Sequence, residues 1–314
     1  MTHSYYESSA RARIAGLLDA DSFHEWLPAA DRLTSPHLAA LEQSAAFDDG
    51  VIVGRGSIAG KQVFFAAQEG GFMGGAVGEV HGAKIVGMLE RAVRDHPAAV
   101  LLLLETGGVR LQEANAGLIA VSEVMRAILS ARAAGVPVIV AIGGQYGCFG
   151  GMGIASRCAS AIIISEEGRL GLSGPEVIET VRGVEEYDSR DRALVWRTVG
   201  GKHRYLLGEC DTIVPDSMEA FQRAIIACIN NGEDWSLEAL EREHQLLGDR
   251  VQRFGSCKDG RDIWRELGWA DPDAIAMMDN DEFIAAAQGR RAKDLECADS
   301  SALEKRGDKS PHSI

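Results

Sequence analysis

Two glycine-rich turns carry the residue types in this chain that are best suited to chemistry. The first is Thr106–Arg110 (TGGVR) and the second is Gly147–Gly153 (GCFGGMG). Each follows a continuous apolar run and precedes a helical pattern. Glycine lets the main chain approach a ligand closely, and the first turn of a helix leaves peptide N–H groups unpaired. Paired turns of this kind suit a developing negative charge on oxygen and require no side-chain nucleophile.

The elements that must position these turns are two buried strands. Residues 99–104 and 136–142 are continuous apolar runs separated by one helical stretch. Such runs predict neighbouring parallel strands that are buried on both faces. Because right-handed crossovers bring the ends of parallel strands to the same edge of a sheet, we expect both turns to face one crevice.

Several side chains near the turns have alternative interpretations. Arg110 could hold a carboxylate or brace its turn through Glu113, and bracing is favoured. The polar tips of Gln145 and Tyr146 are placed to reach a bound acyl group. Cys148 is a possible nucleophile, but catalysis by Cys148 is disfavoured because no histidine lies near it in the sequence.

Common catalytic and metal-binding signatures are absent from the sequence. It contains no GxSxG, GxxxxGK[ST], GxGxxG or HExxH motif. Glu241–His244 holds one Glu-x-x-His pair, for which a solvated helix face is the favoured interpretation. His81 lies near the start of an expected helix, where a structural histidine is favoured over a ligand-binding one. The six cysteines are scattered without a CxxC pair, so we predict no metal site.

Composition limits the class of protein. The chain has 314 residues, 46% hydrophobic content, a net charge of −14 and a pI near 5.1. This length supports a full core in one large or two modest domains. The acidic balance argues against nucleic acid and anionic membranes as partners. With no signal pattern and no apolar run of the roughly 20 residues that a membrane span needs, the sequence predicts a reduced cytoplasmic protein.

The chain divides into four predicted regions. They are a helical N-terminal arm without strands (1–49), a strand and helix core (50–230), a helical C-terminal extension (231–298) and a polar, disordered tail (299–314). In the arm, helical patches are expected at 10–18 and 38–45. The core is expected to open with a hairpin at 51–58 and 62–67 and to continue with helices at 78–95 and 111–134.

Four motifs in the core carry a resemblance to a known family. They are, in chain order, Phe72–Gly78, Thr106–Glu113, Gly150–Ser156 and Leu170–Glu179. Their order and approximate spacing resemble the carboxyltransferase branch of the crotonase superfamily, over roughly residues 50 to 230. The resemblance implies an α/β, crotonase-like spiral of ββα units in which peptide N–H groups of two glycine loops stabilise a thioester enolate.

The resemblance also implies site residues. The oxyanion donors fall at Gly107 or Gly108 in the first turn and at Gly150 or Gly151 in the second. The residues expected to contact substrate lie around these donors: Phe72, Gly74, Gly75, Arg110, Gln145, Tyr146, Phe149 and Gly174. Phe72, Met73 or Phe149 could supply an apolar wall near a leaving carboxylate. Tyr146, His81 and a water molecule remain equal candidates for the proton donor to the enolate.

Departures from the family pattern narrow the choice within it. Residues 1–49 contain no cysteine, unlike the zinc ribbon of acetyl-CoA carboxylase β subunits, and no second homologous half follows the core. The chain is most similar to the β-subunit family of malonate decarboxylases, particularly the biotin-independent type. That resemblance implies decarboxylation of malonyl-S-acyl carrier protein to acetyl-S-acyl carrier protein and CO2, at a site shared with a γ subunit.

The implied partners are the γ subunit, the acyl carrier protein and the acyl carrier protein transferase (α) subunit. No cofactor is expected to bind this chain directly, because the substrate is carried on the phosphopantetheine-type group of the carrier protein. The main alternative is a carboxyltransferase subunit of a biotin-dependent decarboxylase or acyl-CoA carboxylase. A non-catalytic scaffold that docks acyl carriers is a third hypothesis, and fold alone decides none of these.

Overall fold

One seven-stranded sheet organises the protein. The computed structural model describes residues 3–40, 42, 50–231 and 235–294. The strands lie in chain order across the sheet: β1 His24–Trp26, β2 Val51–Ile58, β3 Lys61–Gln68, β4 Ala99–Leu104, β5 Val138–Ile142, β6 Ala161–Ser165 and β7 Thr212–Val214. Strands β1 to β3 pair antiparallel, and β3 to β7 pair parallel. The predicted hairpin and the predicted parallel neighbours are both confirmed.

The expectation that the arm contains no strand is wrong. His24–Trp26 pairs antiparallel with Val53–Arg55 of β2, and the Trp26 ring packs edge-on against Phe64 with centroids 4.9 Å apart. Three residues are too few for an alternating pattern to stand out in the sequence. The strand forms because the edge of β2 needs partners for its backbone groups.

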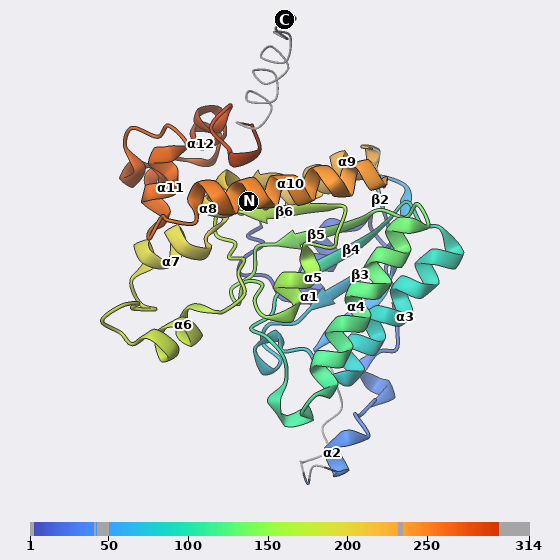
Figure 1. Cartoon of the computed structure of the whole chain (residues 1–314). Helices are drawn as coiled ribbons and strands as arrows, with labels where there is room; N and C mark the ends of the chain where they lie inside the picture. The colour runs from blue at the N-terminus through green and yellow to red at the C-terminus, as the bar shows by residue number, and fades with distance from the viewer. Residues whose placement is uncertain (1–2, 41, 43–49, 232–234, 295–314) are drawn as a thin grey trace, which may run out of the picture.

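Twelve α-helices are described; α3 and α4 lie against the sheet, whereas α6, α7, α11 and α12 lie beyond one end of it (Figure 1). Their bounds are α1 Ala10–Leu17, α2 His37–Ala40, α3 Glu79–Asp95, α4 Ala116–Ala133, α5 Gly151–Ser156, α6 Pro175–Arg182, α7 Arg192–Val199, α8 Gly201–Leu206, α9 Met218–Asn230, α10 Leu237–Phe254, α11 Gly260–Glu266 and α12 Asn280–Ala287.

The helix expected at 111–134 starts later than predicted. Leu111–Glu113 forms a separate 3₁₀ turn, and α4 begins only at Ala116. Ala114 lies between them with φ +48° and ψ −126°, a conformation outside the helical region that interrupts the helix. The end of the patch expected at 38–45 and the tail expected at 299–314 lie outside the described residues.

Two hydrophobic cores cover the two faces of the sheet. Along β4, Val100, Leu102 and Leu104 face a core with α3 and α4, whereas Leu101 and Leu103 face a core with α1 and α9. This alternation follows from the two-residue period of a strand. Helices α3 and α4 run side by side along the first face (Figure 1). With both faces covered, β4 is rigidly held, and so is the point where the first glycine turn begins.

The same two cores bear on the predicted regions of the chain. Phe254, Trp264 and Phe283 of the C-terminal helices belong to the same core as the apolar side chains of α3 and α4. Ile14 and Leu17 of the N-terminal arm belong to the opposite core. Arm and extension therefore both pack on one sheet, and the division into regions stays a prediction.

Beyond the strand ends, the loops form a second, smaller ladder. Parallel bridges join Val77 to Val109, Thr106 to Cys148 and Cys148 to Leu170. Each unit thus gives one strand to the sheet, one extended loop segment to the ladder and then a helix. This is the ββα repeat of the crotonase-like fold, which confirms the predicted fold class. Among the described helices, none combines the length and apolar content needed to cross a bilayer.

Candidate active site

The two glycine turns lie directly beside one another at the carboxyl edge of the sheet. The N–H of Thr106 donates to the carbonyl of Gly147 at 2.8 Å, and the N–H of Phe149 donates to the carbonyl of Thr106 at 2.9 Å. These bonds continue the β4–β5 pairing past the last strand residues. The two turns therefore lie side by side, as the two apolar runs predicted, and a ligand crevice shared by them stays a prediction.

Two of the four predicted donors are occupied within the protein. The N–H of Gly107 donates to the carbonyl of Gly74 at 2.9 Å, and the N–H of Gly150 donates to the carbonyl of Leu172 at 2.9 Å. A peptide N–H in a good hydrogen bond has no second proton to offer. The proposal for oxyanion donors therefore narrows to Gly108 and Gly151.

The remaining two donors have the freedom that a ligand requires. The N–H of Gly108 meets only the hydroxyl of Thr106, at a long 3.2 Å. Gly151 is the first residue of α5, and its N–H has no hydrogen-bond partner among the described residues. Gly108 has φ +144°, a conformation that effectively only glycine adopts. The backbone here is shaped to present N–H groups.

A third glycine segment, Phe72–Gly75, holds the first turn from its other side. Gly74 and Gly75 have φ +64° and +68°. A β-carbon on Gly75 would lie 1.9 Å from the carbonyl oxygen of Glu105, so no larger residue fits. Through the carbonyl of Gly74 this segment fixes Gly107. Its contact with substrate stays a prediction.

Arg110 braces the loops. Its side chain is buried, and Nη1 lies 3.2 Å from Glu113 Oε1 while Nε donates to the carbonyl of Ala76 at 2.9 Å. The guanidinium carbon also stands 5.3 Å from the centre of the Phe72 ring. These contacts match the bracing interpretation of Arg110. Substrate contact by Arg110 or Phe72 stays a prediction.

The remaining predicted substrate-binding residues line the second turn. Gln145 and Tyr146 are exposed, and the backbone carbonyl of Gln145 accepts a hydrogen bond from Arg169. Gly174 caps the N-terminus of α6. Phe149 is buried in a small core with Tyr187, Val195 and Val199, so it supports the loop from inside. Contact of these residues with substrate stays a prediction.

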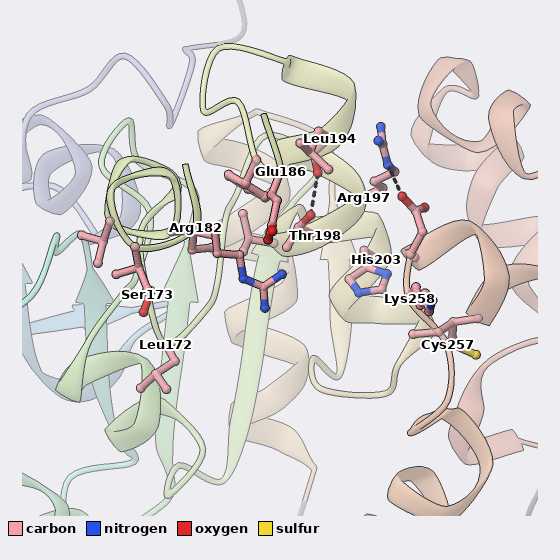
Figure 2. A pocket seen from close by; sticks show the side chains of 18 of the residues that line it. Leu172, Ser173, Arg182, Glu186, Leu194, Arg197, Thr198, His203, Cys257 and Lys258 are labelled. Carbon is pink, nitrogen blue, oxygen red and sulfur yellow. Dashed lines mark hydrogen bonds and ion pairs between the residues drawn. The ribbon is translucent and has the colours of Figure 1, made fainter. Parts of the chain in front are cut away.

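A cavity of about 640 Å³ lies among α6, α7, α8 and the segment Leu172–Ser173 (Figure 2). Its wall begins at Leu172, whose carbonyl holds Gly150, and at Ser173. The cavity is within the size range of ordinary small-molecule sites. Its lining combines the apolar residues Val177, Val181 and Leu194 with the cationic residues Arg182, Arg197, Arg204 and Lys258.

The electrostatics of the cavity wall are set by paired charges and one neutral histidine. Arg197 Nε lies 2.8 Å from Asp259 Oδ2 (Figure 2). The Trp264 indole N–H donates to His203 Nδ1 at 3.1 Å. Burial, reinforced by the nearby Arg204, lowers the pKa of His203 to about 3. His203 is therefore uncharged at neutral pH, with its proton on Nε2.

Other candidate groups from the sequence have structural surroundings. Cys148 is fully buried, and desolvation raises its pKa far above the ordinary thiol value, which disfavours a thiolate nucleophile. His81 is buried, with Nε2 at 3.0 Å from the Gln68 amide nitrogen. Within the described ranges no group of three or more His, Cys, Asp or Glu side chains is placed to hold a metal ion.

Sequence reasoning missed two features of this site. The first is Glu105, which follows β4 directly and is bonded to Arg13 of α1. A charged residue at the end of a buried apolar strand indicates that it has a partner. That partner, Arg13, lies 92 positions away in the sequence, so it could not be identified from spacing. The second is the cavity against α6 and α7, because no local pattern indicates which helices leave space between them.

The fold and the paired glycine loops define a crotonase-like protein of the carboxyltransferase type. The carboxyl transferase domain matches residues 3–232, and the chain belongs to this family. It is 40% identical to the malonyl-S-ACP:biotin-protein carboxyltransferase MADC of Malonomonas rubra, over 92% of this chain and 97% of that protein.

Solved structures give the same relationship. The chain is 41% identical to a chain of a Pseudomonas malonate decarboxylase hetero-tetramer in complex with malonate, with a TM-score of 0.73 over 82% of this chain and 95% of that one. It is 38% identical to a chain of the Pseudomonas malonate decarboxylase MdcD-MdcE hetero-dimer, with a TM-score of 0.63 over 81% and 97%. The resemblance to malonate decarboxylases stated from the motifs is confirmed, and the chain is an enzyme subunit of this family.

Proposed function

We propose that this chain is the β-type subunit of a malonate decarboxylase that acts as a carboxy-lyase on malonyl-S-acyl carrier protein. The observation that carries the proposal is the placement of Gly108 and Gly151 in two adjacent turns, each with an N–H that is not committed to a good hydrogen bond within the protein. The family relationship supplies the class of substrate.

The proposed reaction needs these donors and little else. The bond between the carboxylate carbon and the methylene carbon of the malonyl group breaks, and CO2 leaves. The electron pair moves into the thioester carbonyl and places a negative charge on its oxygen. N–H groups aimed at that oxygen stabilise the transition state more than the ground state, which is what accelerates the step. A proton added to the enolate carbon then gives the acetyl thioester.

The substrate is proposed to arrive on a carrier. The relative from Malonomonas rubra is named for malonyl-S-ACP, and a carrier-bound thioester reaches an active site through a flexible arm. The cavity of about 640 Å³ begins at Leu172, whose carbonyl accepts from the N–H of Gly150, and its lining includes Arg182 and Lys258, which suit an acidic arm. The phosphopantetheine-type group would then remain on the carrier, with no cofactor held by this chain.

A partner subunit is proposed to complete the site. Several apolar side chains near the turns and the cavity are exposed in the single chain: Leu111, Leu118, Ile119, Ile154, Leu172, Val177 and Val181. Exposed large apolar side chains in this number are expected where a partner subunit covers the surface. Because the related structures are a hetero-dimer and a hetero-tetramer, we infer a γ subunit on this surface, with the carrier protein and its α transferase in the larger complex.

A second function is favoured by one specific observation. The relative at 40% identity is a carboxyltransferase to a biotin protein, so the carboxyl group could move to biotin instead of leaving as CO2. The same N–H donors serve both reactions, because both pass through the thioester enolate. The proportion of turnover that needs biotin therefore separates the two.

The test is release of CO2 from malonyl-carrier protein by the chain co-purified with its co-expressed partners. Direct decarboxylation predicts full release in the presence of avidin. Complete loss of release with avidin, restored by excess biotin, would overturn the main proposal and establish the biotin-dependent reaction. No turnover under either condition would support a docking scaffold.

A further inference from the structure

The carboxylate of Glu105 lies against the main chain just before two of the glycine segments, at Gly70 and at Gly144 to Tyr146. Glu105 directly precedes the first turn, and its Oε1 accepts a hydrogen bond from the N–H of Tyr146 in the second turn at 3.1 Å. A β-carbon on Gly144 would lie 2.3 Å from the Glu105 carboxyl carbon, and one on Gly70 would lie 2.7 Å from it. The main chain of both neighbouring segments thus packs directly on this one side chain.

The charge of this carboxylate is balanced from the N-terminal arm. Arg13 Nη1 of α1 makes a short ion pair with Glu105 Oε2, and both side chains are almost fully buried. The guanidinium is held by the carbonyl of Tyr5 at 3.0 Å from Nε and by the Tyr5 ring at 4.6 Å. In addition, the backbone N–H of Glu105 donates to Gln68 Oε1 at 3.0 Å.

We propose that Glu105 and Arg13 form a positioning pair that sets the two N–H donors of the site relative to each other. Glu105 holds the second turn against the first, and Arg13 neutralises Glu105. The rate measurement for this inference rests on the proposed function, whereas the measurement of amide hydrogen exchange in the two turns rests on geometry alone. It makes the N-terminal arm a functional part of the active site.

Neutralisation matters because of the charge that the reaction develops. An unpaired buried carboxylate one residue before the first turn would repel an enolate oxygen held by that turn. A buried pair that loses one partner also leaves an uncompensated charge, whereas replacing both partners by neutral groups is far milder. Loss of Arg13 should therefore be worse for the rate than loss of both charges together.

The variants follow from this argument. Arg13→Met removes the cation with similar volume, Glu105→Gln keeps an acceptor for the Tyr146 N–H, and the double variant removes both charges. Arg11→Ala is the matched control, because Arg11 lies on the same helix and makes an exposed pair with Glu25 far from the turns. Each variant is purified as the complete complex, and its melting temperature is recorded with its kinetics.

Comparison of Arg13→Met with the double variant separates charge balance from a merely structural role. Both variants lose the ion pair, but only Arg13→Met leaves a buried carboxylate without its cation. If Arg13 acts by neutralising Glu105, Arg13→Met/Glu105→Gln should recover part of the kcat that Arg13→Met loses. A merely structural pair would leave the double variant at least as slow as Arg13→Met.

The variants should differ in kcat, in KM and in amide hydrogen exchange. Arg13→Met should lose at least tenfold in kcat with KM within about twofold of the parent. The double variant should exceed Arg13→Met in kcat by at least threefold, and Arg11→Ala should match the parent. Amide hydrogen exchange in residues 106–108 and 145–151 should rise together in Arg13→Met but not in Arg11→Ala.

The outcomes distinguish this inference from the proposed function. Absence of CO2 release by the parent complex would reject the proposed function, and the exchange measurement would still decide the positioning pair. Parent-like turnover in Arg13→Met, or a double variant no faster than Arg13→Met, would overturn the inference while leaving the proposed function intact. So would unchanged hydrogen exchange in both turns.

Discussion

Gly150 and Gly108 approach so closely that a β-carbon on Gly150 would lie 3.0 Å from the Cα of Gly108. The two residues belong to different strand-to-helix units, and each has positive φ, +65° and +144°. Main chain meets main chain at this point, with no side chain between the turns. Any displacement of one turn is therefore transmitted directly to the N–H groups of the other.

Gly108→Ala should lower kcat by about 10² to 10³ with little change in subunit assembly. A β-carbon at Gly108 meets no atom within 4 Å, so the effect arises from the backbone conformation that alanine cannot adopt, which moves the N–H donor. Gly135→Ala is the matched control, because Gly135 has φ +80° in open space in the turn before β5. If Gly108→Ala and Gly135→Ala have the same melting temperature and the same turnover, Gly108 has no oxyanion role.

Gly151→Ala should also lower kcat, for a steric reason that can be reversed. Its β-carbon would lie 2.7 Å from Val121 Cγ1 on α4, so the start of α5 must shift. Adding Val121→Ala makes room and should recover most of the lost rate. Steady-state CO2 release measures both effects. A double variant no faster than Gly151→Ala would show that the position tolerates no β-carbon for another reason.

The isolated chain should be nearly inactive, with turnover restored by a co-purified γ subunit. The physical reason is that large apolar side chains such as Leu111 and Val181 are exposed in the single chain, as expected where a partner subunit covers the surface. Measurement of CO2 release against γ concentration, with mass photometry of the same samples, checks this. Full turnover by the monodisperse single chain would contradict it.

Cys148→Ala should keep turnover within about threefold of the parent. Cys148 is buried, and desolvation raises the pKa of its thiol, so it supplies no thiolate at neutral pH. A thiol reagent should label the partly exposed Cys257 well before Cys148, as peptide mapping would show. Loss of activity that tracks labelling of Cys148 would instead assign this residue a chemical role.

His203→Asn should make the stability of the protein less sensitive to acid. Burial lowers the pKa of His203 to about 3 in the folded state, so only the unfolded state binds this proton between about pH 6.5 and 3. The parent therefore loses up to about 1.4 kcal/mol per pH unit as the pH falls through that window, and keeps its full stability above it.

Asparagine retains an acceptor for the Trp264 N–H and does not titrate, so denaturant unfolding from pH 7 to 4 should give a shallower slope in His203→Asn. The exposed His244 on α10 provides the control, as His244→Asn should leave the slope unchanged. Identical slopes for the parent and His203→Asn would show that the histidine is protonated in the folded protein.

The sequence was sufficient where the signal is local. The apolar run 99–104 and the glycines after it predicted a buried strand and a tight turn, and both lie where expected. The assignment of donors needed the fold, because Gly107 and Gly150 are consumed by Gly74 and Leu172 from other units. Hydrogen bonds between distant segments leave no periodic trace in a single sequence.

The same reasoning explains the errors. The strand His24–Trp26 is too short to alternate and exists only because β2 has an open edge. The break at Ala114 has no glycine or proline to announce it. The ion pair of Arg13 with Glu105 joins an arm to a strand end across most of the core, so neither residue type nor spacing indicates it.

The N-terminal arm is synthesised first but can dock only late. The N–H of Tyr6 donates to Asp216 Oδ1 at 2.8 Å across 210 residues, and Gln222 of α9 donates to the carbonyl of Leu17 at 2.8 Å. At roughly 5 to 20 residues per second, a ribosome needs on the order of 10 to 40 seconds to cover that distance. During this interval the nascent chain carries Arg13 before the surface that will receive its helix has been made. Translation itself therefore delays the docking of the arm, and with it the pairing of Arg13 with Glu105.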